Sequence, residues 1–117
     1  DYPTFIARAA QAVSAHPEDR RAIILGGSGQ GEAMCANRFQ GVRAGVFYGH
    51  TGTQTDAGGK TLDMLASLRM HNNANILSLG ARFLPPHEAQ EAVRVFLTTS
   101  FEPLERHVRR ITELDKS

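Results

Sequence analysis

Residues 22–32 read AIILGGSGQGE, and this segment sets the architecture expected for the whole chain. Its first four residues form a short apolar run that ends in glycines, which is typical of a strand buried on both faces of a parallel sheet. Residues 32–38 then have the pattern of a helix, with Gly41 just beyond its end. The segment therefore predicts a strand, a tight glycine-rich turn and a helix.

Strand and helix signals alternate on both sides of this segment. Residues 42–48 and 74–80 predict two further strands, and apolar residues at helical spacing predict helices within 5–13, 85–97 and 104–114. The alternation favours an α/β fold, which we expect to be a three-layer Rossmann-like sandwich with a parallel sheet. A sheet of three strands leaves an open edge, so we expect it to continue in a missing N-terminal segment or across a partner chain.

Residues 49–60 separate the second predicted strand from the next helix, which we expect Thr61 to cap. They are polar and glycine-rich, so we expect an extended mobile loop. Because glycine-rich surface loops tolerate added length, we favour a surface insertion over a lid that covers a site. A total of 117 residues fits one domain, and we treat residues 1–117 as a single unit.

The composition argues against several functional classes. Thirteen Lys and Arg against twelve Asp and Glu leave a net charge of +1, so no general electrostatic attraction to nucleic acid or to a membrane surface is expected. No apolar run approaches the roughly 18 residues that a membrane-spanning helix needs.

Cysteine and histidine usage bears on compartment and on metal binding. The one cysteine, Cys35, cannot form an internal disulfide, and we interpret it as a small core residue of a cytoplasmic protein. The histidines are scattered singly and there is no second cysteine, so we predict neither a metal nor another cofactor. The five histidines are His16, His50, His71, His87 and His107.

The glycine-rich turn is the first candidate site, because glycines at a strand–helix junction let backbone N–H groups approach an anion. The turn has neither the Lys-Ser/Thr pair of a Walker loop nor the glycine spacing of a dinucleotide fingerprint, so a plain tight turn is the alternative. Glu32 falls in the first turn of the following helix. A carboxylate there is either a partner for the helix dipole or a general base beside an oxyanion site.

Histidine and arginine side chains supply the other candidates. His71 precedes the third predicted strand, where it is either a cap or surface group or a proton shuttle. Arg82 follows that strand at the sheet edge of the glycine turn, where a surface ion pair is the simpler interpretation. Arg106 and Arg110, with the basic residues at 107 and 109, form a cationic cluster that is either a solvated helix face or a phosphate clamp.

Taken together, in their order and spacing, these motifs resemble the ribose-5-phosphate isomerase B family, which includes the galactose-6-phosphate isomerase subunits. The similarity covers almost the whole chain, although none of its motifs is specific alone. The matching segments are residues 1–3 (DYP), 26–32 (GGSGQGE), 36–38 (ANR), 41–44 (GVRA), 71–77 (HNNANIL), 80–82 (GAR) and 106–110 (RHVRR).

The resemblance implies an aldose–ketose isomerase that moves a proton between C1 and C2 of a phosphorylated sugar through an enediolate. Many family members have a catalytic Cys directly before the glycine turn, where this chain has Gly26. The chain is similar to the branch that uses a Glu, which falls on Glu32. The resemblance also implies an oxyanion site at the backbone of Gly27, Gly29 and Gly31, with Ser28 moving a proton between the sugar oxygens. It implies ring opening by His71, with Asn72 beside it and Tyr2 lining the substrate. The implied phosphate-binding residues are Arg82, Arg106 and Arg110.

The resemblance also implies an assembly. Family members have a five-stranded parallel sheet and form dimers whose sites combine residues of both subunits. They begin with a strand–helix–strand unit that contributes to the site, and this chain would start after that unit. A homodimer or a dimer of dimers is therefore expected.

Three functions remain open at this point. The leading one is interconversion of ribose 5-phosphate and ribulose 5-phosphate. A six-carbon substrate such as allose or galactose 6-phosphate is the first alternative, because the sequence does not give the length of the pocket. The second is a module that binds a phosphorylated sugar or nucleotide without turning it over.

Overall fold

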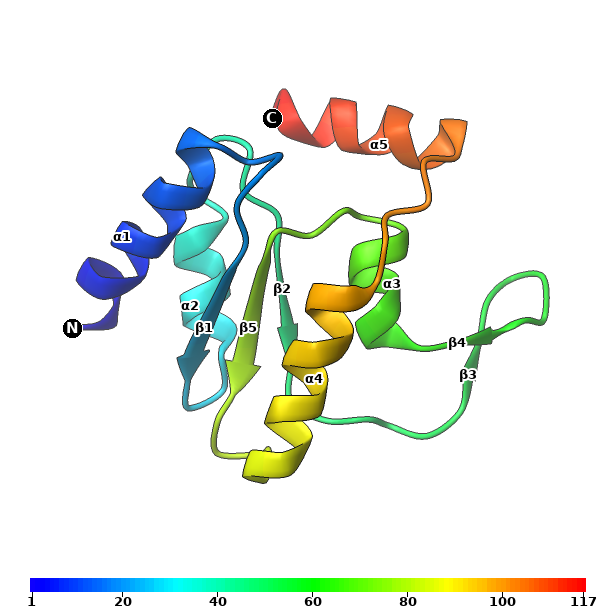
Figure 1. Ribbon diagram of the computed structural model, residues 1–117, viewed down its shortest axis with the longest axis horizontal. Helices are drawn as coiled ribbons and strands as arrows, with labels where there is room; N and C mark the ends of the chain where they lie inside the picture. Colours follow the sequence, from blue (N-terminus) through cyan, green and yellow to red (C-terminus); the bar gives the residue numbers. More distant parts are fainter.

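A parallel three-stranded sheet forms the centre of the computed structural model, which describes residues 1–117 throughout (Figure 1). Its strands are β1 (Ala22–Gly26), β2 (Ala44–Phe47) and β5 (Ile76–Gly80), in the order β1-β5-β2. Ala22 and Ala44 both lie opposite Ile76, so all three strands begin at one edge of the sheet. We call this the amino edge, and we call the opposite edge, where residues 26, 47 and 80 lie, the carboxyl edge.

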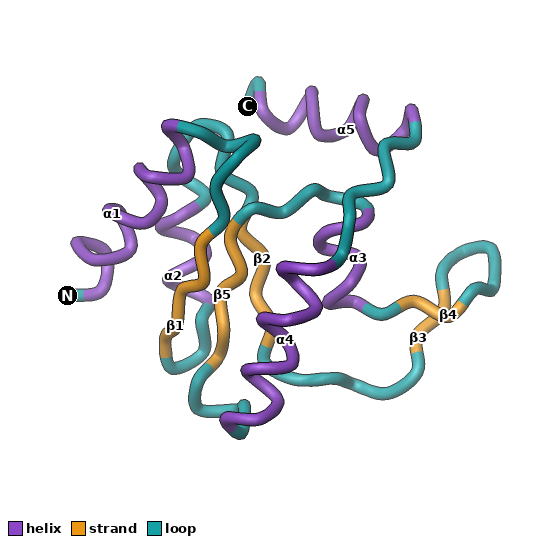
Figure 2. The backbone as a smooth tube through the Cα atoms, in the orientation of Figure 1, coloured by secondary structure: helices purple, strands orange, loops and turns teal.

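Helices cover both faces of this sheet, which confirms the predicted three-layer α/β sandwich (Figure 2). One apolar core joins the sheet to α1 and α2, and a second joins it to α3 and α4. Figure 1 shows α5 lying apart from both layers, across the amino edge. The helices are α1 (Tyr2–Ala15), α2 (Gln30–Ala36), α3 (Met64–Met70), α4 (Pro86–Thr98) and α5 (Glu105–Asp115).

The central strand β5 holds the two cores together. Leu77 and Leu79 belong to the core with α3 and α4, whereas Ile76 belongs to the core with α1 and α2, as expected for side chains that alternate across a strand. All five residues of β5 are buried. In β1, by contrast, Leu25 is 59% exposed, so the prediction that this strand is buried on both faces is wrong. The reason is its position, because β1 lies at the end of the strand order and has one strand neighbour.

The segment expected to be a loop over residues 49–60 contains regular structure. Strand β3 (Gln54–Thr55) pairs antiparallel with β4 (Thr61–Leu62), and this hairpin extends away from the sheet. Thr61 therefore lies in a strand and does not cap α3. The cap is Asp63, whose Oδ1 accepts a hydrogen bond from the Leu65 N–H at 3.0 Å.

None of the helices combines the length and the apolar character that crossing a membrane requires.

Candidate active site

The glycine turn after β1 is joined to the loop after β5 by the backbone. The N–H groups of Ala81 and Arg82 donate to the carbonyl oxygens of Gly26 and Gly27, at 2.8 and 3.1 Å. The Arg82 side chain lies over Gly27, where a Cβ atom would come within 3.2 Å of its Nε. Arg82 and the glycine turn thus share the carboxyl edge, as the sequence predicts.

Gly29 fixes the path of this turn. Its φ of 77° is in the left-handed region, and a Cβ there would come within 3.0 Å of the Leu79 carbonyl group. The Gly29 carbonyl oxygen accepts a hydrogen bond from Ser78 Oγ at 2.6 Å, and Ser78 is fully buried in β5. Because side chain and backbone both hold the turn against β5, its N–H groups have a defined position.

Glu32 lies directly beside this turn. Its side chain occupies the space above Gly26, so that a Cβ atom added at residue 26 would overlap the Glu32 carboxyl group. The residue is only 9% exposed, and it takes part in none of the ion pairs of the chain. A glycine at 26 and a glutamate at 32 therefore depend on each other sterically, and the Glu32 carboxyl group has no ion-pair partner.

Ser28 and Tyr2 complete the group at the carboxyl edge. Ser28 Oγ accepts a hydrogen bond from the Gln30 N–H at 3.2 Å. The Tyr2 hydroxyl lies over Gly31, where a Cβ atom would come within 2.5 Å of it. A carboxylate, a hydroxyl, a phenol and a guanidinium thus lie around the glycine turn.

The remaining predicted residues gather at the amino edge. His71 directly follows α3 and lines a cavity of about 660 Å³ together with Arg106 and Arg110 from α5. Asn72 is next to it in the chain, and its backbone carbonyl accepts a hydrogen bond from Arg43 Nε at 3.2 Å. The two arginines of the predicted clamp therefore face the same cavity as the histidine.

The predicted cationic cluster is smaller than the sequence suggests. Arg109 lies on an exposed part of α5 and forms an ion pair with Glu105 at 2.6 Å. His107 is 4% exposed and points into the protein. Arg106 and Arg110, one helical turn apart on the same face of α5, therefore remain as the two arginines of the cluster that line the cavity.

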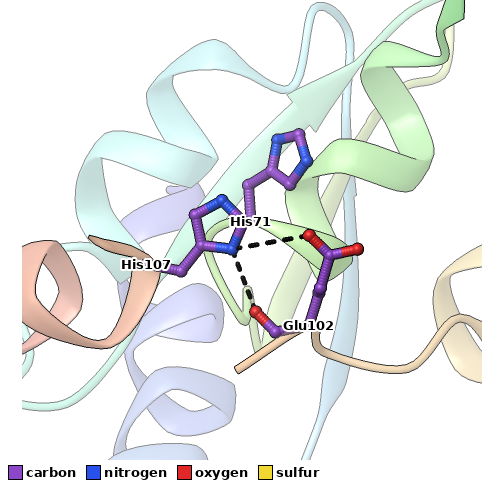
Figure 3. A group of neighbouring side chains, drawn as sticks. All are labelled: His71, Glu102 and His107. Carbon is purple, nitrogen blue, oxygen red and sulfur yellow. Dashed lines mark hydrogen bonds and ion pairs between the residues drawn. The ribbon is translucent and has the colours of Figure 1, made fainter. Parts of the chain in front are cut away.

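The prediction that the histidines are scattered is wrong for His71 and His107, which Figure 3 shows together with Glu102. The two imidazole rings are 4.7 Å apart between centroids and tilted by 34°. His107 Nδ1 donates to the Glu102 carbonyl oxygen at 2.9 Å and lies 4.0 Å from Glu102 Oε1. No sequence spacing indicates this group, because α5 meets the end of α3 only through tertiary packing.

Buried arginines at the amino edge were also missed by the sequence analysis. Arg43 forms an ion pair with Asp115 of α5 at 3.1 Å and donates to the carbonyl oxygen of Asn73. Arg69 is buried near Arg43 and Arg21. Burial, and then repulsion from these two cations, lowers the pKa of Arg69 to about 10. Two buried guanidinium groups therefore lie at the amino edge, and the ion pair with Asp115 neutralises that of Arg43.

The predicted site residues thus form two groups on opposite edges of the sheet (Figure 1). Glu32 and Arg82 lie beside the ends of β1 and β5, whereas His71 and Arg106 lie beyond the start of β5. Five residues of β5 separate these edges, which is about 13 Å at the rise of a strand. Within one chain, the structure does not bring the two groups together.

Comparison with known sequences gives the relatives of this chain. Residues 1–114 match the model of the family described as Ribose/Galactose Isomerase. Ribose-5-phosphate isomerase B of Mycolicibacterium paratuberculosis is 35% identical over 111 residues, which are 95% of this chain and 62% of that protein. The protein of the same name from Mycobacterium tuberculosis is also 35% identical, and the match covers 60% of its length. The chain thus spans about three fifths of the length of these curated relatives.

Solved structures agree with these matches. Type B ribose 5-phosphate isomerase from Trypanosoma cruzi has a TM-score of 0.83 at 34% identity, and the match covers 99% of this chain and 69% of that one. Ribose-5-phosphate isomerase B from Mycoplasma genitalium, solved with bound ribulose-5-phosphate, has a TM-score of 0.84 at 32% identity and is covered to 68%. Sequence, fold and the order of the motifs agree, and the chain belongs to the ribose/galactose isomerase family that includes ribose-5-phosphate isomerase B.

Proposed function

We propose that residues 1–117 act as one sugar-phosphate isomerase domain, which interconverts ribose 5-phosphate and ribulose 5-phosphate. The observation that carries this proposal is the buried Glu32 carboxylate above Gly26, beside the glycine turn that is held against β5. Relatives at 35% identity are named ribose-5-phosphate isomerase B, and a neighbour in structure holds ribulose-5-phosphate. A base next to an oxyanion site is what proton transfer beside a carbonyl group requires.

The chemistry is assigned to the carboxyl edge. Glu32 removes the proton from C2 of the open-chain aldose, and the negative charge that develops on O1 is stabilised by the N–H groups of Gly27, Gly29 and Gly31. Ser28 moves a proton from O2 to O1. Glu32 then returns its proton to C1, which leaves the carbonyl group at C2 and completes the ketose.

Ring opening and phosphate binding involve the amino edge. His71 moves a proton between the O1 hydroxyl and the ring oxygen, a task for which imidazole is suited near neutral pH. Arg106 and Arg110 bind the phosphate, since guanidinium groups match its oxygens in pairs. Asn72 and Tyr2 bind the substrate, and Arg82 binds the phosphate from the carboxyl edge.

A single copy of the chain is not sufficient for this mechanism. The ring-opening histidine and the base both act at C1 and C2, so both must lie within hydrogen-bond reach of neighbouring atoms. In one copy they are separated by the length of β5, about 13 Å. We therefore assign each site to two copies, the carboxyl edge of one and the amino edge of the other, in a homodimer or a dimer of such dimers in the cytoplasm.

The test uses the full-length natural protein and follows the conversion of ribose 5-phosphate to ribulose 5-phosphate by NMR. Glu32→Gln keeps the shape of the side chain and removes the base, so turnover should fall by about 10²- to 10⁴-fold. Glu113→Gln, on the exposed face of α5, is the matched control and should keep wild-type turnover. If Glu32→Gln retains wild-type turnover, Glu32 is not the base.

The same assay distinguishes the alternatives when allose 6-phosphate and galactose 6-phosphate are run beside the pentose. A higher kcat/KM for either hexose phosphate assigns a six-carbon substrate, which the family description also allows. Binding of ribose 5-phosphate by a folded protein without conversion would instead favour the non-catalytic binding module.

A further inference from the structure

Three side chains converge at the amino edge, and the proposed isomerase mechanism uses only one of them, His71. His71 follows α3, Glu102 lies between α4 and α5, and His107 is in the first turns of α5. Each offers one potential ligand atom, and these three atoms lie within 4.8 Å of one another (Figure 3). We propose that His71, Glu102 and His107 form a binding site for a transition-metal ion, with Zn²⁺ as the best match.

The orientation of His107 is already that of a metal ligand. A backbone carbonyl oxygen only accepts hydrogen bonds, so the contact with Glu102 at 2.9 Å places the proton of the neutral ring on Nδ1. Nε2 then keeps its lone pair for a metal. Histidine ligands in metal sites are typically held in this way, by a hydrogen bond from the other ring nitrogen. Because His107 is buried and packs against the His71 ring, this orientation is fixed by the fold.

The other two ligands have the freedom to close the site. Ligand atoms around tetrahedral Zn²⁺ are about 3.3 Å apart, so the present separations must shorten by about 1.5 Å. The Glu102 side chain is 41% exposed, and its one ion-pair contact is a long one, 4.0 Å between Oε1 and His107 Nδ1. His71 is half-buried. We expect rotation of the Glu102 and His71 side chains to bring the ligand atoms together, with the fourth position taken by water from the adjoining cavity of about 660 Å³.

The charges around this cavity permit a cation and the donor atoms select its type. The charged residues of the lining balance, with three cations and three acids: Lys60, Arg106, Arg110, Asp56, Asp63 and Glu102. Two imidazole nitrogens and one carboxylate oxygen suit Zn²⁺, Co²⁺ or Ni²⁺ better than Mg²⁺ or Ca²⁺, which prefer oxygen ligands alone. A site for a borderline-soft divalent ion is the assignment that fits both facts.

The metal would also affect turnover, a consequence that rests on the proposed function. His71 is the residue assigned to ring opening, and a metal bound to its ring nitrogen takes up the lone pair needed for proton transfer. Zn²⁺ should therefore inhibit the isomerase, whereas the site itself does not depend on the reaction.

Metal binding is measured first on the metal-free full-length protein, by competition for Zn²⁺ with a chromophoric chelator and by the visible absorption of bound Co²⁺. Glu102→Gln removes the anionic ligand and keeps the backbone carbonyl that orients His107. Asp56→Asn removes the same charge from the same cavity without removing a ligand, and is the matched control. We expect Glu102→Gln to weaken Zn²⁺ binding at least about tenfold, and Asp56→Asn to weaken it less than about threefold.

His107→Gln should weaken Zn²⁺ further, but because His107 is buried, Glu102→Gln is the variant on which the proposal depends. A wild-type Kd for Zn²⁺ above about 100 μM, or equal weakening by the Glu102 and Asp56 variants, would overturn the site. Weaker Zn²⁺ binding in Glu102→Gln alone supports the site even if the protein converts no ribose 5-phosphate. Failure of the metal site and failure of the proposed function are therefore distinguishable. In an active protein, a fixed Zn²⁺ concentration should reduce wild-type turnover by a larger fraction than that of Glu102→Gln, and equal fractions would count against the proposed metal site.

Discussion

The two edges of the central sheet are constructed from different kinds of interaction. At the carboxyl edge, backbone hydrogen bonds and the absence of side chains at Gly26 and Gly29 place Glu32. At the amino edge, side chains place the residues of α5, through the Arg43–Asp115 ion pair and the contact between the His71 and His107 rings. The proposed proton transfer between C1 and C2 is thus assigned to an edge fixed by local backbone geometry. Ring opening and phosphate binding are assigned to an edge that depends on how α5 docks.

The largest effect should come from mixing two variants that are defective at different edges. Glu32→Gln and His71→Gln each disable both sites of their own homodimer. If a site takes its carboxyl edge from one copy and its amino edge from the other, a mixed dimer has one intact site and one with both changes. Random assembly gives half mixed dimers, so turnover should recover to about a quarter of wild type from two nearly inactive parents.

The measurement is the turnover of the two variants co-expressed with different tags, compared with each variant alone. Glu32→Gln mixed with Glu32→Ala is the control, because both changes lie at the same edge and no mixed dimer contains an intact site. Activity of the first mixture that only equals the mean of its parents would show that the edges of two copies do not combine.

A second, smaller effect is expected from Gly26→Ala, which tests the carboxyl edge alone. The added methyl group needs the space of the Glu32 carboxyl group, and the end of that flexible side chain will move while the fold remains. Displacement of a catalytic group by about 1 Å costs about 10²-fold in kcat. Gly58→Ala is the matched control, since its Cβ would meet only Asp56 at an ordinary 3.4 Å.

A double variant with Gly26→Ala and Glu32→Ala tests whether residue 26 acts through the Glu32 side chain. Once Glu32 is alanine, the methyl group at 26 displaces nothing, so Gly26→Ala should cause no further loss of turnover. Additive losses would mean that residue 26 acts on the turn itself and not through Glu32.

Much of the carboxyl edge could be predicted from the sequence because its signals are local. The apolar run at 22–25, the glycines after it and the helical spacing beyond them lie within one short segment, and the structure has β1, the turn and α2 there. The placement of the site residues in two groups at opposite edges also follows from their order along the chain. The glycine turn follows a parallel strand and His71 precedes one, so the two must lie at opposite edges.

The amino edge resisted prediction because tertiary contacts create it. Nothing in the spacing of His71 and His107 shows that α5 returns to the end of α3. The burial of Arg43 and its pairing with Asp115 likewise depend on where α5 docks. Likewise, residues 22–25 do not indicate that β1 lies at the end of the strand order, which is why the exposure of Leu25 was unexpected.

The smallest effect is expected from Asp115→Asn, which loosens the docking of α5 without touching the carboxyl edge. Arg43 keeps the carbonyl oxygens of Asn72 and Asn73 as acceptors, so the free energy of unfolding should fall by only about 1 kcal/mol. Glu105→Gln breaks the exposed ion pair with Arg109 on the same helix. This variant should change the free energy of unfolding by less than about 0.5 kcal/mol. Chemical denaturation of both variants measures the difference.

The KM and kcat of the same two variants show whether the docking of α5 positions the substrate-binding arginines or only stabilises the fold. Since α5 carries Arg106 and Arg110, a looser helix should raise the KM for ribose 5-phosphate a few-fold while Glu32 keeps kcat unchanged. Glu105→Gln should leave both constants at wild-type values. A fall in kcat with an unchanged KM in Asp115→Asn would contradict the division of roles between the edges, because it would mean that the docking of α5 controls the base on the far side of the sheet.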